Sequence, residues 1–169
     1  MKKNLVRALL LLLLIADMIF IFSNSAQTAS ASSSTSHGVT EMVAPVIVPN
    51  YKDMDEQTQK ATVSSLEVIL REAAHLLQFT PLGFALYLLL TTFALPEKIR
   101  RLRIPLTLGF GLIYAISDEI HQLFVPGRSF QLFDIFMDMC GVAVGCAGGM
   151  ILLMIIGAVQ KKHVAHIRS

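Results

Sequence analysis

The chain has 169 residues, of which 54% are hydrophobic and only 15% charged, and its mean hydropathy is +0.62. Soluble domains carry about a quarter charged residues, so this composition excludes an ordinary soluble domain and favours a bilayer as the solvent. The net charge of +2 is small, and the sequence holds no basic stripe with interleaved aromatic residues, which excludes nucleic acid as the expected partner.

The first apolar run extends from Leu5 to Phe22 and contains a single acidic residue, Asp17. Cations precede the run and small residues follow it, as in a secretory signal. The run is long for a signal, and an acid inside it is better explained by a partner in a helix bundle. We therefore predict a retained transmembrane helix in residues 1–22, with cleavage as the alternative.

A long connection, residues 23–72, follows this helix. Residues 23–40 are rich in Ser, Thr and Ala, a composition typical of a flexible linker. In residues 50–70, acidic residues precede apolar ones at helical spacing, which predicts a short amphipathic helix on the membrane surface. The connection is thus expected to be an extracytoplasmic loop with one surface helix.

Three further apolar runs complete the chain, at residues 73–95, 104–116 and 132–159. A membrane-spanning helix needs roughly 20 residues. The middle run is short and reaches this length only if its helix continues through Gln122. We predict an all-α fold with four transmembrane helices, the last three forming a core in residues 73–169 that ends in a short basic tail.

The cations predict the orientation of the helices. Three of them lie before or at the start of the first run, four fill the connection between the second and third runs, and three follow the last run, so ten of the fourteen belong to one side. By the positive-inside rule, that side is the cytoplasm. We therefore expect a multi-pass protein of the cell membrane with both termini cytoplasmic.

This topology brings ionisable residues from several helices to the outer membrane face. Placing a charged side chain in an apolar membrane helix costs roughly several kcal/mol of insertion free energy unless the charge is paired or hydrated. We therefore expect these side chains to face inward and contact one another. The ligand-binding candidates are Arg71, His75, Asp118, Glu119, His121, Gln122, Arg128, Asp134 and Asp138.

Arg128 follows the turn-forming pair Pro126-Gly127, between two helix ends that carry carboxylates. Its planar guanidinium suits two-point binding of a phosphate. The alternative is a structural salt bridge with Asp134 or Asp118. The two interpretations are compatible, and the sequence leaves both open.

Two histidines, His75 and His121, lie near carboxylates and suit either acid–base chemistry or metal binding. Neither occurs in a metal-ligand spacing, so we expect buried histidines hydrogen-bonded to carboxylates, no metal and no cofactor. Three glycines that follow Asp138 are spaced four residues apart: Gly141, Gly145 and Gly149. They predict close helix packing, within the chain or in a homo-oligomer. Cys140 and Cys146 are interpreted as packing residues.

A family resemblance rests on the polar block at 118–128 (Asp-Glu-Ile-His-Gln-Leu-Phe-Val-Pro-Gly-Arg) and on the acids and glycines at 134–145. This pattern resembles the VanZ-like membrane proteins, as do His75 and the Phe-Ser-Asn-Ser stretch at 22–25. The sequence departs from the family at Asp138, where Asn is common, and at Arg71, where Lys is frequent. The resemblance implies a bacterial cell-envelope protein, in a family whose founding member is linked to teicoplanin resistance.

Three functions compete at this stage. The first is binding of an anionic membrane lipid or a lipid-linked envelope precursor at the outer leaflet, linked to glycopeptide resistance. The second is a membrane-embedded hydrolase of a lipid phosphate or envelope precursor, because Arg128-x5-Asp134-x3-Asp138 is similar to an Arg-x5-His-x3-Asp block of lipid phosphate phosphatases. In this chain Asp replaces the nucleophilic histidine, and the other blocks are missing. The third is a structural or assembly subunit without catalysis.

Overall fold

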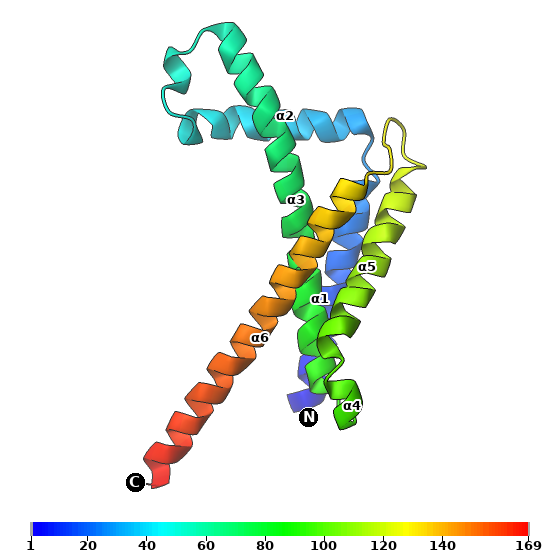
Figure 1. Cartoon of the computed structure of the whole chain (residues 1–169), viewed down its shortest axis with the longest axis vertical. Coiled ribbons are helices and arrows are strands. Elements are labelled where there is room, and N and C mark those ends of the chain that lie inside the picture. The colour runs from blue at the N-terminus through cyan, green and yellow to red at the C-terminus, as the bar shows by residue number, and fades with distance from the viewer. Residues whose placement is uncertain (1, 169) are drawn as a thin grey trace.

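A computed structural model describes residues 2–168, which form helices without any strand (Figure 1). The predicted all-α class is therefore confirmed. The elements in chain order are α1 (Lys2–Ser25), α2 (Ala29–Ile47), the short 3-10 helix η1 (Tyr51–Asp53), α3 (Glu56–Thr92), α4 (Glu97–Arg100), α5 (Arg103–Gln122) and α6 (Leu132–Arg168).

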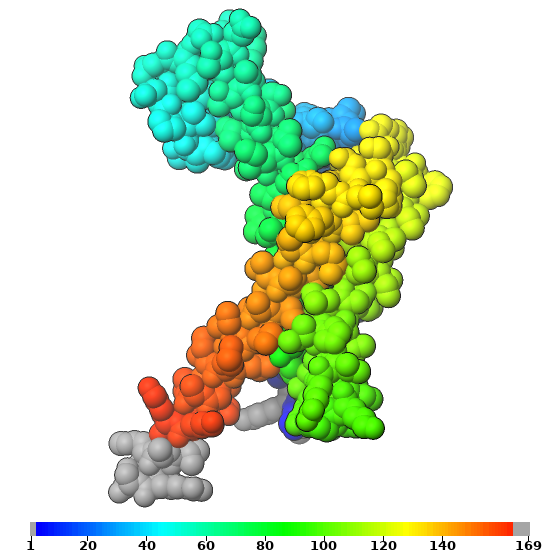
Figure 2. Space-filling model, viewed as in Figure 1, coloured from blue at the N-terminus to red at the C-terminus, as the bar shows by residue number. Residues whose placement is uncertain are grey.

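Four of these helices, α1, α3, α5 and α6, run along one another, and α3 with α6 forms the most extensive interface. Their core contains Ile21, Phe79, Leu82 and Val142, all almost fully buried. The second half of α6 leaves the bundle and extends away from the other helices (Figure 2). At the opposite end of the bundle, α2 runs across the other helices instead of along them (Figure 1).

Three helices are long and apolar enough to cross a membrane: Lys3–Ser25, Glu56–Thr92 and Leu132–His163. α5 has 20 residues and packs against α6 and α3. Three of its 20 residues, Arg103, Asp118 and Glu119, are charged. A fourth membrane crossing by α5 stays a prediction.

The predicted flexible linker at residues 23–40 is wrong, because most of it belongs to the 19-residue helix α2. Thr28 caps the helix by accepting a hydrogen bond from the Ala31 amide, which satisfies one of the free amides of the first turn. Thr40 and Ala44 are fully buried in the packed structure. Capping and packing against α3 thus override a composition that is typical of linkers.

The predicted short surface helix at residues 50–70 is also wrong in its extent. Asp55 caps the helix start by accepting from the Thr58 amide, but no Gly or Pro interrupts the chain before Pro81, and α3 continues for 37 residues to Thr92. Such a helix is about 55 Å long, against a hydrocarbon core of about 30 Å. Its first turns therefore project beyond the bundle, and the boundary expected after residue 72 falls inside one helix.

Glycines bring the backbones of α3 and α6 into contact. A Cβ atom at Gly141 would lie 2.3 Å from the Leu76 carbonyl oxygen, and one at Gly145 would lie 2.0 Å from that of Thr80. A Cβ atom at Gly149 would meet the Tyr87 ring at 2.9 Å. The predicted glycine stripe thus packs against α3 of the same chain.

Candidate functional site

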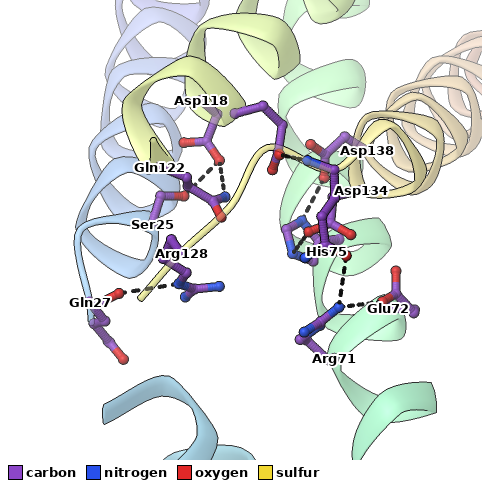
Figure 3. A network of polar contacts seen from close by, with 12 residues as sticks. Ser25, Gln27, Arg71, Glu72, His75, Asp118, Gln122, Arg128, Asp134 and Asp138 are labelled. Carbon is purple, nitrogen blue, oxygen red and sulfur yellow. Dashed lines mark hydrogen bonds and ion pairs between the residues drawn. The ribbon is translucent and has the colours of Figure 1, made fainter. Parts of the chain in front are cut away.

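His75 on α3 lies between two carboxylates of α6 (Figure 3). Its Nδ1 is 3.0 Å from the Asp138 carboxylate, and its Nε2 is 3.5 Å from that of Asp134. Both aspartates are almost completely buried. The four-residue spacing of the aspartates puts them on one face of α6, and the imidazole joins both to α3.

Arg71 lies one helical turn before His75 on α3. Its Nη2 donates to the Glu72 carboxylate at 3.2 Å and, more weakly, to the Gln131 side-chain oxygen at 3.5 Å. The Gln131 backbone amide donates to the buried Glu119 carboxylate at 2.7 Å. One chain of contacts therefore connects α3, the start of α6 and α5.

Asp118 connects α5 to α1 from its buried position. The Ser25 hydroxyl donates to the Asp118 carboxylate at 2.7 Å, and the Gln122 amide donates to the same oxygen at 3.2 Å. The Asn24 amide donates to the Gln78 side chain at 3.2 Å, which connects α1 to α3. Polar pairs thus fasten the end of α1 to both neighbouring helices.

Arg128 lies on the tight turn after Gly127, whose φ of 77° favours glycine. Its Nε donates to the Gln27 carbonyl oxygen at 3.3 Å. Among the residues that the structure describes, Arg128 makes no ion pair, so the salt bridge considered with Asp134 or Asp118 is not formed. Burial, together with the positive charge of Arg71, lowers the pKa of Arg128.

Two adjoining hollows, of about 280 and 210 Å³, lie between α2 and the end of the bundle. Both are lined by Arg71, Arg128, Ser32 and Ser36. The larger one also reaches Glu67, Ser33 and Gln131. The smaller one reaches into the bundle, where its lining includes Ser25, His75, Gln78 and Gln122. The two guanidiniums thus share one polar cavity under α2.

His121 does not join the polar contacts of the other candidates. Its ring stacks on Phe22, with centroids 4.3 Å apart, and its buried Nδ1 has no hydrogen-bond partner. Asp17 is also apart from them, and one of its carboxylate oxygens is buried without a partner. Eight of the nine candidates are thus gathered around the cavity or directly behind it, and His121 is not.

The sequence analysis missed Gln27, Ser32 and Ser36. The last two were hidden by the linker interpretation, although their four-residue spacing, continued by the buried Thr40, follows one face of a helix. Gln27 binds Arg128 through its backbone carbonyl oxygen, and no sequence pattern predicts such a contact. Within the described part of the chain, no group of three His, Cys, Asp or Glu side chains is arranged to hold a metal ion.

The model of the VanZ/LLP1 family matches residues 9–156, which include every residue of the cavity. The chain belongs to the VanZ/LLP1 family. Comparison with curated proteins and with solved structures gave no significant match. The family and the three long apolar helices together make the chain a membrane protein.

Proposed function

We propose that this VanZ/LLP1 family member binds the phosphate group of an anionic lipid, or of a lipid-linked envelope precursor, in the cavity beneath α2. One observation carries the proposal: Arg71 and Arg128 line the same two hollows, and Arg128 has no carboxylate partner among the described residues. A phosphate between them would accept hydrogen bonds from both guanidiniums and compensate their mutual repulsion.

The surroundings of the two arginines suit such a ligand. The serine side chains of α2, Ser32 and Ser36, provide hydroxyl donors at the cavity wall. The buried carboxylates Asp134 and Glu119 lie behind the cavity lining, and the one carboxylate in the lining, Glu67 of the larger hollow, contacts His37. A phosphate would therefore meet mainly donors, and the buried acids would contribute by fixing the helices that carry the arginines.

The location follows from the cations. With both termini in the cytoplasm and α5 as a fourth crossing, the cavity lies at the outer leaflet of the cell membrane. The setting then matches the glycopeptide resistance of the family's founding member. We propose that the bound lipid or precursor changes the access of teicoplanin-like drugs to the outer leaflet.

Binding is tested by native mass spectrometry of the purified full chain with dioleoyl phosphatidic acid, and with dioleoyl phosphatidylcholine for comparison. Wild type is expected to retain phosphatidic acid preferentially. Arg128→Lys keeps the charge but loses the planar fork, so the preference should fall several-fold. Arg101→Lys is the matched control, because Arg101 pairs with Glu97 in the exposed α4 turn. Equal retention of both lipids by wild type would refute the proposal.

The cellular role is tested by teicoplanin susceptibility in a bacterial host that lacks the gene. Wild type, Arg128→Lys and Arg101→Lys are expressed, and membrane protein levels are measured in parallel. Loss of protection by Arg128→Lys at a normal protein level supports a binding site. Protection that follows the protein level alone indicates the structural or assembly subunit instead.

The hydrolase alternative receives less support from the geometry. Both nitrogens of His75 face carboxylates, and Asp134 is buried behind the imidazole. A general base needs one nitrogen directed at its substrate. Release of inorganic phosphate from phosphatidic acid by wild type, and its absence in Asp134→Asn, would reverse this ranking.

A further inference from the structure

The exposed surface of α2 divides into an apolar side and a polar side. Val39, Met42 and Val46 are 47%, 78% and 82% exposed. Their spacing of three and four residues puts them on one side of the helix, within an arc of about 60° at 3.6 residues per turn. We call these three residues the α2 stripe.

Polar residues occupy the other side of the helix. Ser30, Ser34, His37 and Glu41 follow one another at intervals of three or four residues and are exposed. His37 contacts Glu67 of α3 at 2.6 Å and Glu41 at 3.3 Å. A helix with opposite apolar and polar sides suits a boundary between two solvents.

Contacts with α3 show which way each side faces. Thr35 lies four residues before Val39, on the side of the stripe, and lines the smaller hollow with His75 and Gln78. The polar side instead contacts Glu67, which lies two helical turns from His75 towards the projecting start of α3. The stripe therefore faces the membrane-spanning part of the bundle, and the polar side faces away from it.

Three connections fix α2 at the level where the apolar helices end. α2 begins four residues after Ser25, the last residue of α1. The Ala29 amide donates to the Pro126 carbonyl oxygen in the α5–α6 connection at 3.2 Å, and His37 contacts Glu67 farther along. α2 runs across the bundle at this level, with its second half beyond the other helices (Figure 1).

We propose that α2 lies in the plane of the membrane interface and that the α2 stripe is buried in the boundary between lipid headgroups and acyl chains. Such interfacial helices bury their apolar face about 5–10 Å into that boundary. Three exposed side chains are a small patch compared with the roughly 800 Å² per partner of a stable protein interface, which favours lipid over a second copy. α2 contains no Lys or Arg, so its burial is expected to be independent of lipid charge.

The test compares neighbouring positions on the two sides of α2. Cys140 and Cys146 are replaced by Ala in the full chain, and a single spin-labelled cysteine is introduced by Met42→Cys or, as the matched control, by Glu41→Cys. The proteins are placed in nanodiscs of phosphatidylcholine, with or without phosphatidylglycerol. Collisions of the label with oxygen, which concentrates in lipid, are compared with collisions with a water-soluble nickel chelate.

The proposal expects oxygen to dominate at position 42 and the nickel chelate to dominate at position 41, in both lipid mixtures. Two results overturn it. A label at position 42 that meets the nickel chelate as readily as one at position 41 means that the stripe faces water. A label at position 42 that is shielded from both reagents and couples to a second label means that another copy covers it. Val46→Cys and Ser34→Cys repeat the contrast on other turns.

Discussion

The polar end of the bundle consists of two regions with opposite characters. In one, which we call the acid region, Asp134 and Asp138 of α6 and Glu119 of α5 are buried and each has at least one oxygen without a hydrogen-bond partner. In the other, the arginine region, Arg71 and Arg128 line a cavity beneath α2. Opposite charges lie near each other here, yet Arg128 is not paired with the buried acids.

This difference separates stability from binding. A buried charge that loses its partner is strongly destabilising, so the acid region is expected to hold the helices together. Replacing a charged side chain that faces a cavity costs much less folding free energy. The two regions should therefore respond differently to substitution, and each prediction below tests that separation.

The largest effect is expected in the acid region, from His75→Ala. The substitution removes the imidazole that hydrogen-bonds Asp138 and contacts Asp134, and it leaves two buried carboxyl groups without their shared partner. Each buried polar group left without a partner costs about 1–3 kcal/mol, and more if it is charged. We expect a lower level of folded protein in the membrane and a lower thermal unfolding midpoint in detergent.

Two further variants test whether a loss of stability in His75→Ala comes from the acid region. His121→Ala is the control, because its ring only stacks on Phe22, a contact worth about 0.5–1.5 kcal/mol. Simultaneous replacement of His75, Asp134 and Asp138 by Leu removes the whole buried ionic group and should restore part of the stability. Equal losses from His75→Ala and His121→Ala would mean that the acid region has no special role in stability.

The next effect concerns the helix contact that carries the acid region. Gly145→Ala would put a Cβ atom 2.0 Å from the Thr80 carbonyl oxygen, so the two helices would have to separate. Overpacking of this kind costs about 1–3 kcal/mol. At Gly148 the added Cβ atom would meet the Phe84 ring at an ordinary 3.6 Å. Thermal unfolding of both variants should show a loss for Gly145→Ala and almost none for Gly148→Ala.

Sequence reasoning performs well where a residue's environment follows from its own helix. The apolar runs predict α1, α3 and α6, and the cost of burying charge predicts that polar side chains gather at one end. The same rule predicts that His75 meets a carboxylate, but it does not identify Asp138 as the partner. These predictions need only the periodicity of apolar residues and the cost of desolvating charged ones, and both can be assessed from a single sequence.

The failures concern tertiary contacts. The serine-rich part of α2 resembles a linker because its few apolar residues give little periodicity, and only its contact with α3 makes it a helix. A salt bridge of Arg128 with Asp134 or Asp118 is one of the two interpretations that the sequence leaves open. The turn at Gly127 instead directs its side chain to the Gln27 carbonyl, whose position depends on the path of the chain after α1.

A smaller effect tests whether the two regions are energetically separate. Arg128→Gln and Asp134→Asn are combined in a double-mutant cycle of unfolding free energies. Because these side chains form no ion pair, their effects should add within about 0.5 kcal/mol. A double variant no worse than Asp134→Asn alone would mean that the arginine and acid regions form a single network. Reversible unfolding in detergent, followed by circular dichroism, provides the measurement.

The smallest effect concerns the helix that covers the arginine region, and it depends on pH. The pKa of His37 is raised, chiefly by its hydrogen bond to Glu67, with the charges of Glu41 and Glu67 also contributing. A raised pKa in the folded protein means that protonated His37 stabilises the contact between α2 and α3. This contribution is complete below the ordinary histidine pKa of about 6.5, and it is lost as the pH rises through the higher pKa of the folded protein.

The amides of α2 should therefore exchange hydrogen faster at about pH 8 than at about pH 6, after correction for intrinsic exchange, because the contribution of protonated His37 is complete at the lower pH and is lost as the pH rises above about 6.5. His37→Gln should remove most of that difference. Because His37 and Glu41 are exposed, the effect is expected to be modest and to weaken in high salt. If His37→Gln keeps the full pH dependence, a titratable group other than His37 controls the contact between α2 and α3.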